Sequence, residues 1–78
     1  MDEGYNVNEV HRVLYTILES GDSGATRLKV MAELFMSDRV AKGYIDLVVR
    51  AGMVDCQVEK IFYKITDAGR EWLEENRK

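Results

Sequence analysis

Hydrophobic positions recur at helical spacing over most of the chain. The first apolar stripe predicts a helix from about Val7 to Glu19, and turn residues at positions 20–24 end it. Asn6 is a suitable N-cap, and Glu9, three residues later, completes a pattern that resembles a capping box. The stripe consists of Val10, Val13, Leu14, Ile17 and Leu18.

Two further helices follow with a very short turn between them. One is predicted from about Arg27 to Phe35 with Thr26 as its cap, and the other from about Asp38 to Arg50 with Ser37 as its cap. Helices joined by so tight a turn are typical of a helix-turn-helix. The apolar side of the first of these two helices is predicted to consist of Leu28, Val30, Met31, Leu34 and Phe35.

Beyond Gly52 the hydrophobic pattern changes to a period of two. Alternation at positions 54–58 and 61–65 predicts two antiparallel strands that turn near Glu59 and Lys60. Cys56 shares a face with Val54 and is predicted to be a buried strand residue. Thr66 then caps a last helix from Asp67 to about Asn76. The chain of 78 residues therefore predicts one α+β domain over residues 1–78: three helices, a short β-hairpin and a C-terminal helix.

Composition excludes several classes of protein. A single histidine, His11, and a single cysteine, Cys56, leave no set of metal ligands, and no glycine-rich phosphate loop is present. We therefore expect no enzyme activity, no metal and no cofactor. His11 is expected to be structural or exposed, with a role in pH sensing as the alternative, and a redox role is the alternative for Cys56. So small a core predicts no pocket for a small-molecule ligand.

No apolar run is long enough to cross a membrane, and residues 1–4 lack the features of a signal peptide. A lone cysteine suits a reducing compartment. The expected location is the cytoplasm.

Two sequence segments resemble the winged helix-turn-helix family. The first is Ser37-x7-Ile45-x2-Val48-x2-Ala51-Gly52-Met53-Val54, and the second is Tyr63-Lys64-Ile65-Thr66-Asp67-Ala68-Gly69. The second segment looks like the family's step from the wing into the last helix. The run from Gly24 to Met31, with Met36-Ser37 and Tyr44-Ile45, is also similar to small archaeal and archaeal-virus regulators. A viral origin would place the protein in the cytoplasm of its host.

The resemblance implies a transcriptional regulator that binds double-stranded DNA as a homodimer. The helix from about Asp38 to Arg50 would then enter the major groove of a palindromic or pseudo-palindromic site. A protein-interaction module without DNA binding is the main alternative, because the fold serves both roles. A DNA-packing protein of the chromatin type ranks lower, because it would be strongly basic.

The expected recognition helix divides into two sides. Val40, Ile45, Val48 and Val49, with Ala41 and Tyr44, are predicted to pack against the core. The other side holds Asp38, Arg39, Lys42, Gly43 and Asp46, and Arg39 and Lys42 project in similar directions. Gly43 either allows close approach to the groove or accommodates a neighbouring side chain. Asp38 and Asp46 either accept hydrogen bonds from cytosine or hold Arg39, Lys42 or Arg50 in place.

Other contacts follow from these assignments. Thr26 and Arg27 are predicted to bind phosphate at the start of their helix. The complete set of predicted DNA-binding residues is Thr26, Arg27, Lys29, Ser37, Asp38, Arg39, Lys42, Gly43, Lys60 and Lys64. The predicted dimer contacts are Tyr5, Leu47, Ala68, Trp72 and Leu73, of which Leu47 is expected to be exposed in a monomer.

The net charge of −3 is distributed unevenly. Residues 22–65 hold seven Lys and Arg against six Asp and Glu, whereas residues 1–21 hold one against four and residues 66–78 three against four. The excess of acidic residues therefore lies in the terminal helices. The resemblance implies that these helices face away from DNA. We expect DNA binding with a modest electrostatic component that depends on dimerisation and on fit to a specific site.

Overall fold

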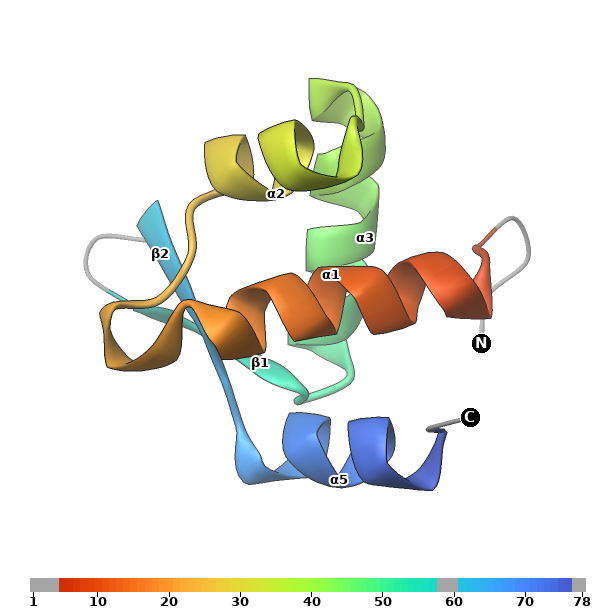
Figure 1. The fold of residues 1–78 in the computed structure, drawn as a ribbon, viewed down its shortest axis with the longest axis vertical. Helices are drawn as coiled ribbons and strands as arrows, with labels where there is room; N and C mark the ends of the chain where they lie inside the picture. Colours follow the sequence, from red (N-terminus) through yellow and green to blue (C-terminus); the bar gives the residue numbers. More distant parts are fainter. Residues whose placement is uncertain (1–4, 58–60, 77–78) are drawn as a thin grey trace.

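The computed structural model describes residues 5–57 and 61–76 of the chain. Helix α1 runs across the middle of the molecule, with α2 above it, α3 crossing behind it and α5 below it (Figure 1). The predicted order of helices and strands is confirmed. In chain order the elements are α1 (Val7–Glu19), the 3-10 turn η1 (Gly21–Ser23), α2 (Arg27–Leu34), α3 (Asp38–Arg50), β1 (Val54–Gln57), β2 (Phe62–Ile65) and α5 (Asp67–Glu75).

Each predicted cap residue accepts a hydrogen bond from the first turn of its helix. Asn6 accepts one from the N–H of Asn8, at 2.8 Å, and caps α1. The predicted capping box is wrong, because the N–H of Asn6 donates to the hydroxyl of Tyr44 and Glu9 instead pairs with Arg12 at 3.0 Å. The other capping contacts are Thr26 with Lys29 N–H, Ser37 with Val40 N–H, and Thr66 with Gly69 N–H.

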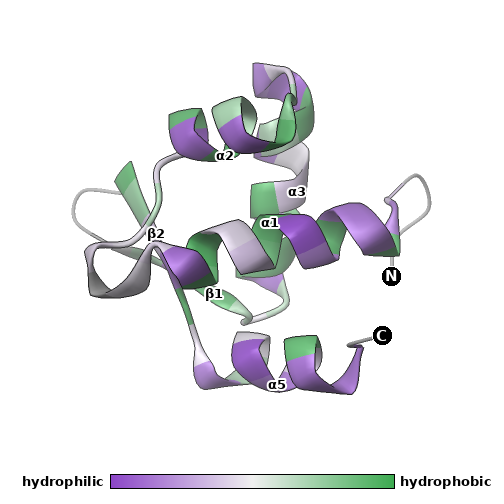
Figure 2. Cartoon of the chain, viewed as in Figure 1, coloured by the Kyte–Doolittle hydropathy of each residue, from purple (hydrophilic) through white to green (hydrophobic). Residues whose placement is uncertain are grey.

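One hydrophobic core lies between the helices and the base of the hairpin. Hydrophobic parts of α1 and α3 face each other inside the molecule, whereas the outer side of α5 is hydrophilic (Figure 2). Burying this much apolar surface is the main force that stabilises so short a chain. The buried core consists of Val10, Val13, Leu14, Ile17, Ala25, Val30, Ala41, Tyr44, Ile45, Val48, Met53, Val54 and Leu73.

The hairpin pairs Val54 with Ile65 at its base and Gln57 with Phe62 at its outer end. The predicted turn near Glu59 and Lys60 lies outside the described residues. A further bridge forms between Ala25 and Tyr63, whose backbone groups exchange hydrogen bonds of 2.9 and 2.8 Å. Gly24 precedes this bridge with a φ of +77°, and a Cβ there would lie 3.0 Å from the carbonyl oxygen of Tyr63. Glycine thus serves both the backbone conformation and the close approach.

The two segments that carry the family resemblance meet in space. The hydroxyl of Thr66 donates to the carbonyl of Gly52 at 2.7 Å, and the N–H of Thr66 donates to the carbonyl of Met53 at 3.0 Å. A Cβ on Gly69 would collide with that same Met53 carbonyl and with the side chain of Ile65. The beginning of α5 is therefore held directly against the turn that ends α3.

Four apolar positions that were predicted to be buried are exposed. Leu28 is 71% exposed because it lies two residues before the buried Val30, on the opposite side of α2. Phe35 is 93% exposed because the chain leaves the helix there, with a φ of 55°. Val40 is 46% exposed at the edge of the packed side of α3. Cys56 is exposed, since the hairpin projects past the helices beyond Val54 (Figure 1).

Candidate nucleic-acid interface

Helix α3 presents a polar outer face. Its inner face consists of the buried residues Ala41, Tyr44, Ile45 and Val48, which anchor the helix on the core. The exposed residues on the other side include Arg39, Lys42, Asp46 and Arg50. With one turn every 3.6 residues, three cations and one carboxylate therefore share one side of the helix.

Gly43 lies beneath another side chain of the same molecule. A Cβ at Gly43 would lie 3.2 Å from the hydroxyl of Tyr5, and the ring of Tyr5 packs edge-on against Tyr44 with 5.1 Å between centroids. Of the two interpretations of Gly43, the structure favours accommodation of a neighbouring side chain. Tyr5, a predicted dimer contact, is half-buried within its own chain by the same packing.

An ion pair connects the starts of α2 and α3. The Nε of Arg27 lies 2.7 Å from the Oδ1 of Asp38, and the two side chains are 44% and 61% exposed. The hypothesis that Asp38 holds Arg39, Lys42 or Arg50 is therefore wrong, because its partner is on the neighbouring helix. Sequence spacing within α3 could not have revealed a contact that depends on how α2 and α3 cross.

Other predicted DNA-binding residues lie near this ion pair. The hydroxyl of Thr26 accepts a hydrogen bond from the N–H of Lys29 at 3.1 Å. Lys29 itself is exposed. Ser37 is exposed and caps α3 next to Asp38. The first turns of both helices thus place Arg27, Lys29 and Ser37 at the surface.

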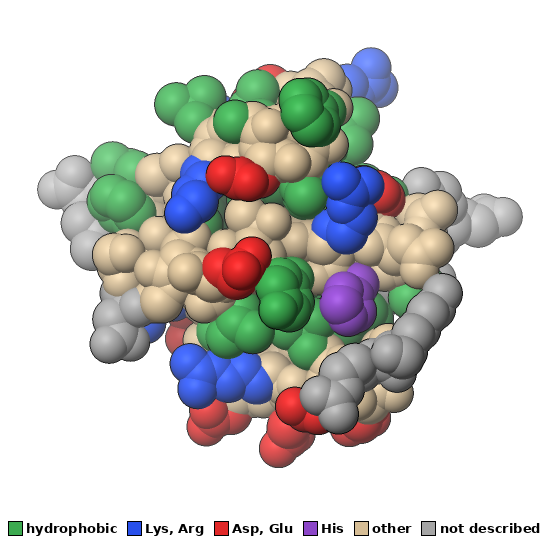
Figure 3. All heavy atoms as spheres, viewed as in Figure 1, with side chains coloured by type: hydrophobic (Ala, Val, Ile, Leu, Met, Phe, Trp, Pro, Cys, Tyr) green, Lys and Arg blue, Asp and Glu red, His purple; other side chains and the backbone are tan. Residues whose placement is uncertain are grey.

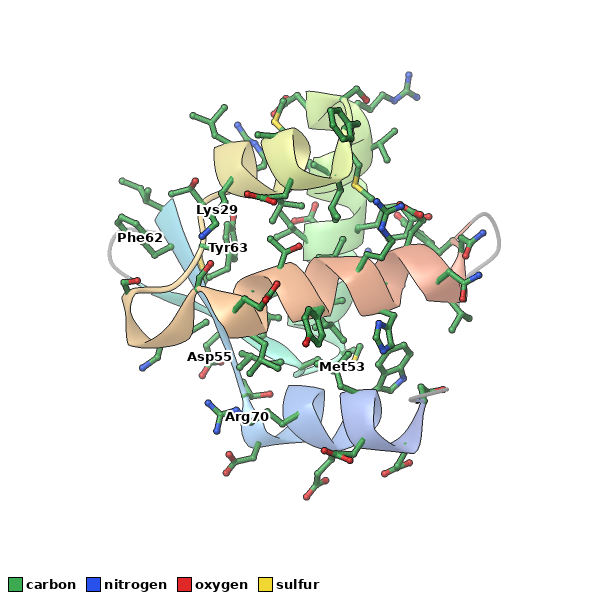
Figure 4. The ribbon with its side chains drawn as sticks, in the orientation of Figure 1. Lys29, Met53, Asp55, Phe62, Tyr63 and Arg70 are labelled. Carbon is green, nitrogen blue, oxygen red and sulfur yellow. The ribbon has the colours of Figure 1, made fainter. Side chains whose placement is uncertain are left out.

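Tyr63 is a residue of this surface that sequence reasoning missed as a site. It lines a shallow cleft of about 240 Å³ between the start of α2 and the hairpin, together with Thr26, Arg27, Leu28 and Ile61. Lys29 and Tyr63 lie on the same side of the molecule (Figure 4). Burial raises the pKa of the Tyr63 phenol, with Cys56 and Asp46 acting in the same direction and Arg27 opposing them. An aromatic residue in an alternating strand gives no sequence signal for such a position.

The two predicted wing contacts are Lys60 and Lys64. Lys60 lies outside the described residues. Lys64 is half-buried on β2, directly opposite Asp55 of β1. Opposite charges at such a cross-strand position attract each other, so Lys64 is not a free surface cation.

Three of the predicted dimer residues lie together. Leu47, Ala68 and Trp72 line an open hollow of about 390 Å³ between α3 and α5, with Glu71 and Glu75 at the same site. Leu47 is half-buried against the core, not exposed as expected. Leu73 is only 7% exposed, so little of its side chain remains for a partner.

A groove also lies between α1 and α5. It has a volume of about 380 Å³, although no pocket was expected from so small a core. The imidazole of His11 stacks on the ring of Tyr15, with 6.2 Å between ring centroids, and its centroid lies 6.3 Å from that of Trp72. Apolar side chains line the space between the two helices, and acidic side chains gather along the outer edge of α5 (Figure 3). The lining residues are His11, Tyr15, Leu18, Arg70, Leu73 and Glu74.

No protein family and no curated protein matches this chain by sequence. Among solved structures, it is similar to BpsR of Bordetella bronchiseptica, a protein whose DNA binding is regulated by 6-hydroxynicotinic acid. The match has a TM-score of 0.77 at 16% identity and covers 95% of this chain. The chain has a winged-helix fold. It spans about half of BpsR, since the match covers 53% of that protein.

The similarity agrees with the geometry described above. The hairpin of β1 and β2 corresponds to the expected wing, α3 corresponds to the helix from about Asp38 to Arg50 that was expected to enter DNA, and Ala25 adds an isolated bridge to β2. The expected likeness to archaeal regulators gains no support from this neighbour. Within residues 5–57 and 61–76, no helix is long and apolar enough to cross a membrane.

Proposed function

We propose that this chain is a transcriptional regulator that binds specific double-stranded DNA through α3. The observation that carries the proposal is the outer face of α3, where Arg39, Lys42 and Arg50 are exposed while the inner face is held by the core. A rigidly packed helix with exposed Arg and Lys can enter the major groove and donate hydrogen bonds to guanine. The DNA binding of BpsR, which has a similar fold, supports this function.

The start of α2 and the start of α3 would fix the position of the protein on the DNA backbone. Arg27 and Lys29 carry positive charge there, and Thr26 and Ser37 supply hydroxyl groups. Lys60, and Lys64 in competition with Asp55, would contact the flanking backbone through the wing. Such contacts raise affinity for any sequence, whereas Arg39 and Lys42 would provide discrimination between base pairs.

The protein would act as a homodimer on a palindromic or pseudo-palindromic site. Leu47, Ala68 and Trp72 in the hollow between α3 and α5 are the proposed contacts. A two-fold axis through this region would place two copies of α3 on successive turns of the same side of the duplex.

The proposal is tested by measuring binding to duplexes selected from a random pool, across a series of salt concentrations. Replacing Arg39 and Lys42 together by Ala should weaken binding to the selected site at least about tenfold, because base contacts are lost. The control replaces Arg12 and Arg70 by Ala, which removes the same charge from α1 and α5 and should change affinity much less. Absence of binding by the unaltered protein to any duplex at low salt would contradict the proposal.

A protein-interaction module is the second candidate function. The strongly exposed side chains of Phe35 and Leu28 favour it, because large apolar groups at the surface often mark protein contacts. The same titration separates the two functions. An interaction module would bind no duplex at low salt, and its contacts would be lost on replacing Phe35 and Leu28 by Ser.

A further inference from the structure

The ion pair between Arg27 and Asp38 has a consequence for DNA recognition. It joins the first residue of α2 to the first residue of α3, with 2.7 Å between Nε and Oδ1. Both side chains remain about half exposed, so the pair lies at the surface that would meet the DNA backbone. Arg27 is also the cation whose charge acts on the Tyr63 phenol in the neighbouring cleft.

A phosphate that approaches Arg27 meets two opposing effects. The guanidinium attracts it and still has donors that Asp38 does not use, because one carboxylate oxygen occupies only the Nε position. The Asp38 carboxylate repels it and competes for the same guanidinium. Both effects operate at a half-exposed surface, where screening is incomplete.

We propose that Asp38 is a specificity-determining residue of this protein. By pairing with Arg27 it opposes the backbone contact on a duplex that α3 does not fit, whereas full insertion of α3 into a fitting site would bring a phosphate close enough to displace the carboxylate. Only a sequence that also forms base contacts with α3 then binds tightly. This inference rests on the proposed DNA-binding function and explains how a chain with a net charge of −3 would combine weak general affinity with selective binding.

The test compares Asp38→Asn with Asp67→Asn. Asp67 is a matched control, because it is also an exposed first residue of a helix and follows a hydroxyl cap, Thr66, at the start of α5. Both variants lose the same charge and the same favourable interaction with a helix dipole. Any effect of net charge alone is therefore common to both.

Binding is measured on a selected duplex and on a scrambled duplex of equal length, across a salt series. Asp38→Asn should raise affinity for the scrambled duplex about five- to tenfold and for the selected duplex less, so that the ratio of the two falls. On the scrambled duplex, the slope of log affinity against log salt should become steeper by about one unit, as one more phosphate is engaged. Asp67→Asn should change neither the ratio nor the slope.

The effect of Asp38→Asn on the ratio of affinities should also depend on Arg27. In the background of Arg27→Gln, the further change Asp38→Asn should no longer alter the ratio of affinities, since the contested phosphate contact is gone. A purely structural pair would instead change thermal stability and leave the salt slope unaltered.

The outcomes distinguish failure of the proposed function from failure of the role of Asp38. If the unaltered protein binds no duplex, the proposed function fails and this inference fails with it. If the protein binds DNA but Asp38→Asn behaves like Asp67→Asn, or acts equally without Arg27, only the specificity role of Asp38 is overturned.

Discussion

Two glycines in helices lie against neighbours of different kinds. Gly69 in α5 lies against the Met53 carbonyl and the Ile65 side chain, both of which are held by the fold. Gly43 in α3 lies against the hydroxyl of Tyr5, the end of a side chain near the beginning of the described residues. A methyl group therefore meets backbone at one site and a movable side chain at the other.

Replacing Gly69 by Ala should lower the free energy of unfolding by about 1–3 kcal/mol, because α5 must move away from the turn that ends α3. Replacing Gly43 by Ala should change stability by less than about 1 kcal/mol, since the gain in helix propensity offsets a small shift of Tyr5. Thermal and urea unfolding of both variants measure the difference. A loss at Gly43 as large as that at Gly69 would contradict this interpretation of the packing.

Residue-level roles were the hardest to predict from the sequence. The exposure of Leu28 follows from its place opposite Val30 on α2, and the exposure of Phe35 from the left-handed backbone that ends the helix. Neither can be read from hydrophobicity alone. The partner of Asp38 depends on the crossing of two helices, whereas a sequence pattern reports neighbours within one helix.

Whole elements were predicted well because their signals are local. The apolar stripe of α1, the hydroxyl caps of α2, α3 and α5, and the alternation in β1 and β2 each depend on residues close in sequence. The bridge from Ala25 to Tyr63 was not predicted, since a single pair of residues leaves no periodic pattern.

Thr66 connects two elements through one hydroxyl group. It accepts the N–H of Gly69 to cap α5 and donates to the carbonyl of Gly52 after α3. Thr66→Ala should therefore cost about 2 kcal/mol, against about 1 kcal/mol for Ser37→Ala, which loses a single capping bond. Thr66→Ser keeps the hydroxyl and should restore most of the difference. Chemical denaturation of the three variants decides the matter, and equal losses for Thr66→Ala and Ser37→Ala would refute the double role.

At the scale of the whole molecule, acidic side chains are concentrated away from α3. Four exposed carboxylates lie on α5, and acidic groups line its outer edge (Figure 3). A duplex would avoid this side and approach the surface formed by α2, α3 and the wing. The opposite side is left for a second copy of the chain, but Glu71 and Glu75 in the hollow limit how many further charges such a contact tolerates.

The proposed dimer therefore makes a prediction about Ala68, which is exposed in the hollow beside Leu47 and Trp72. Ala68→Glu should weaken self-association at least about tenfold, because two copies would bring like charges together at the interface. The fold should persist, since an acidic residue is favourable in the first turn of α5. Sedimentation velocity over a range of concentrations measures the change.

The control for this prediction is Ala32→Glu, which places the same charge at an exposed position of α2. It should leave self-association unchanged. Both variants add one negative charge, so a loss of DNA affinity confined to Ala68→Glu would arise from the loss of simultaneous binding to two half-sites and not from charge. If Ala68→Glu remains as dimeric as the unaltered protein, the hollow between α3 and α5 is not the interface.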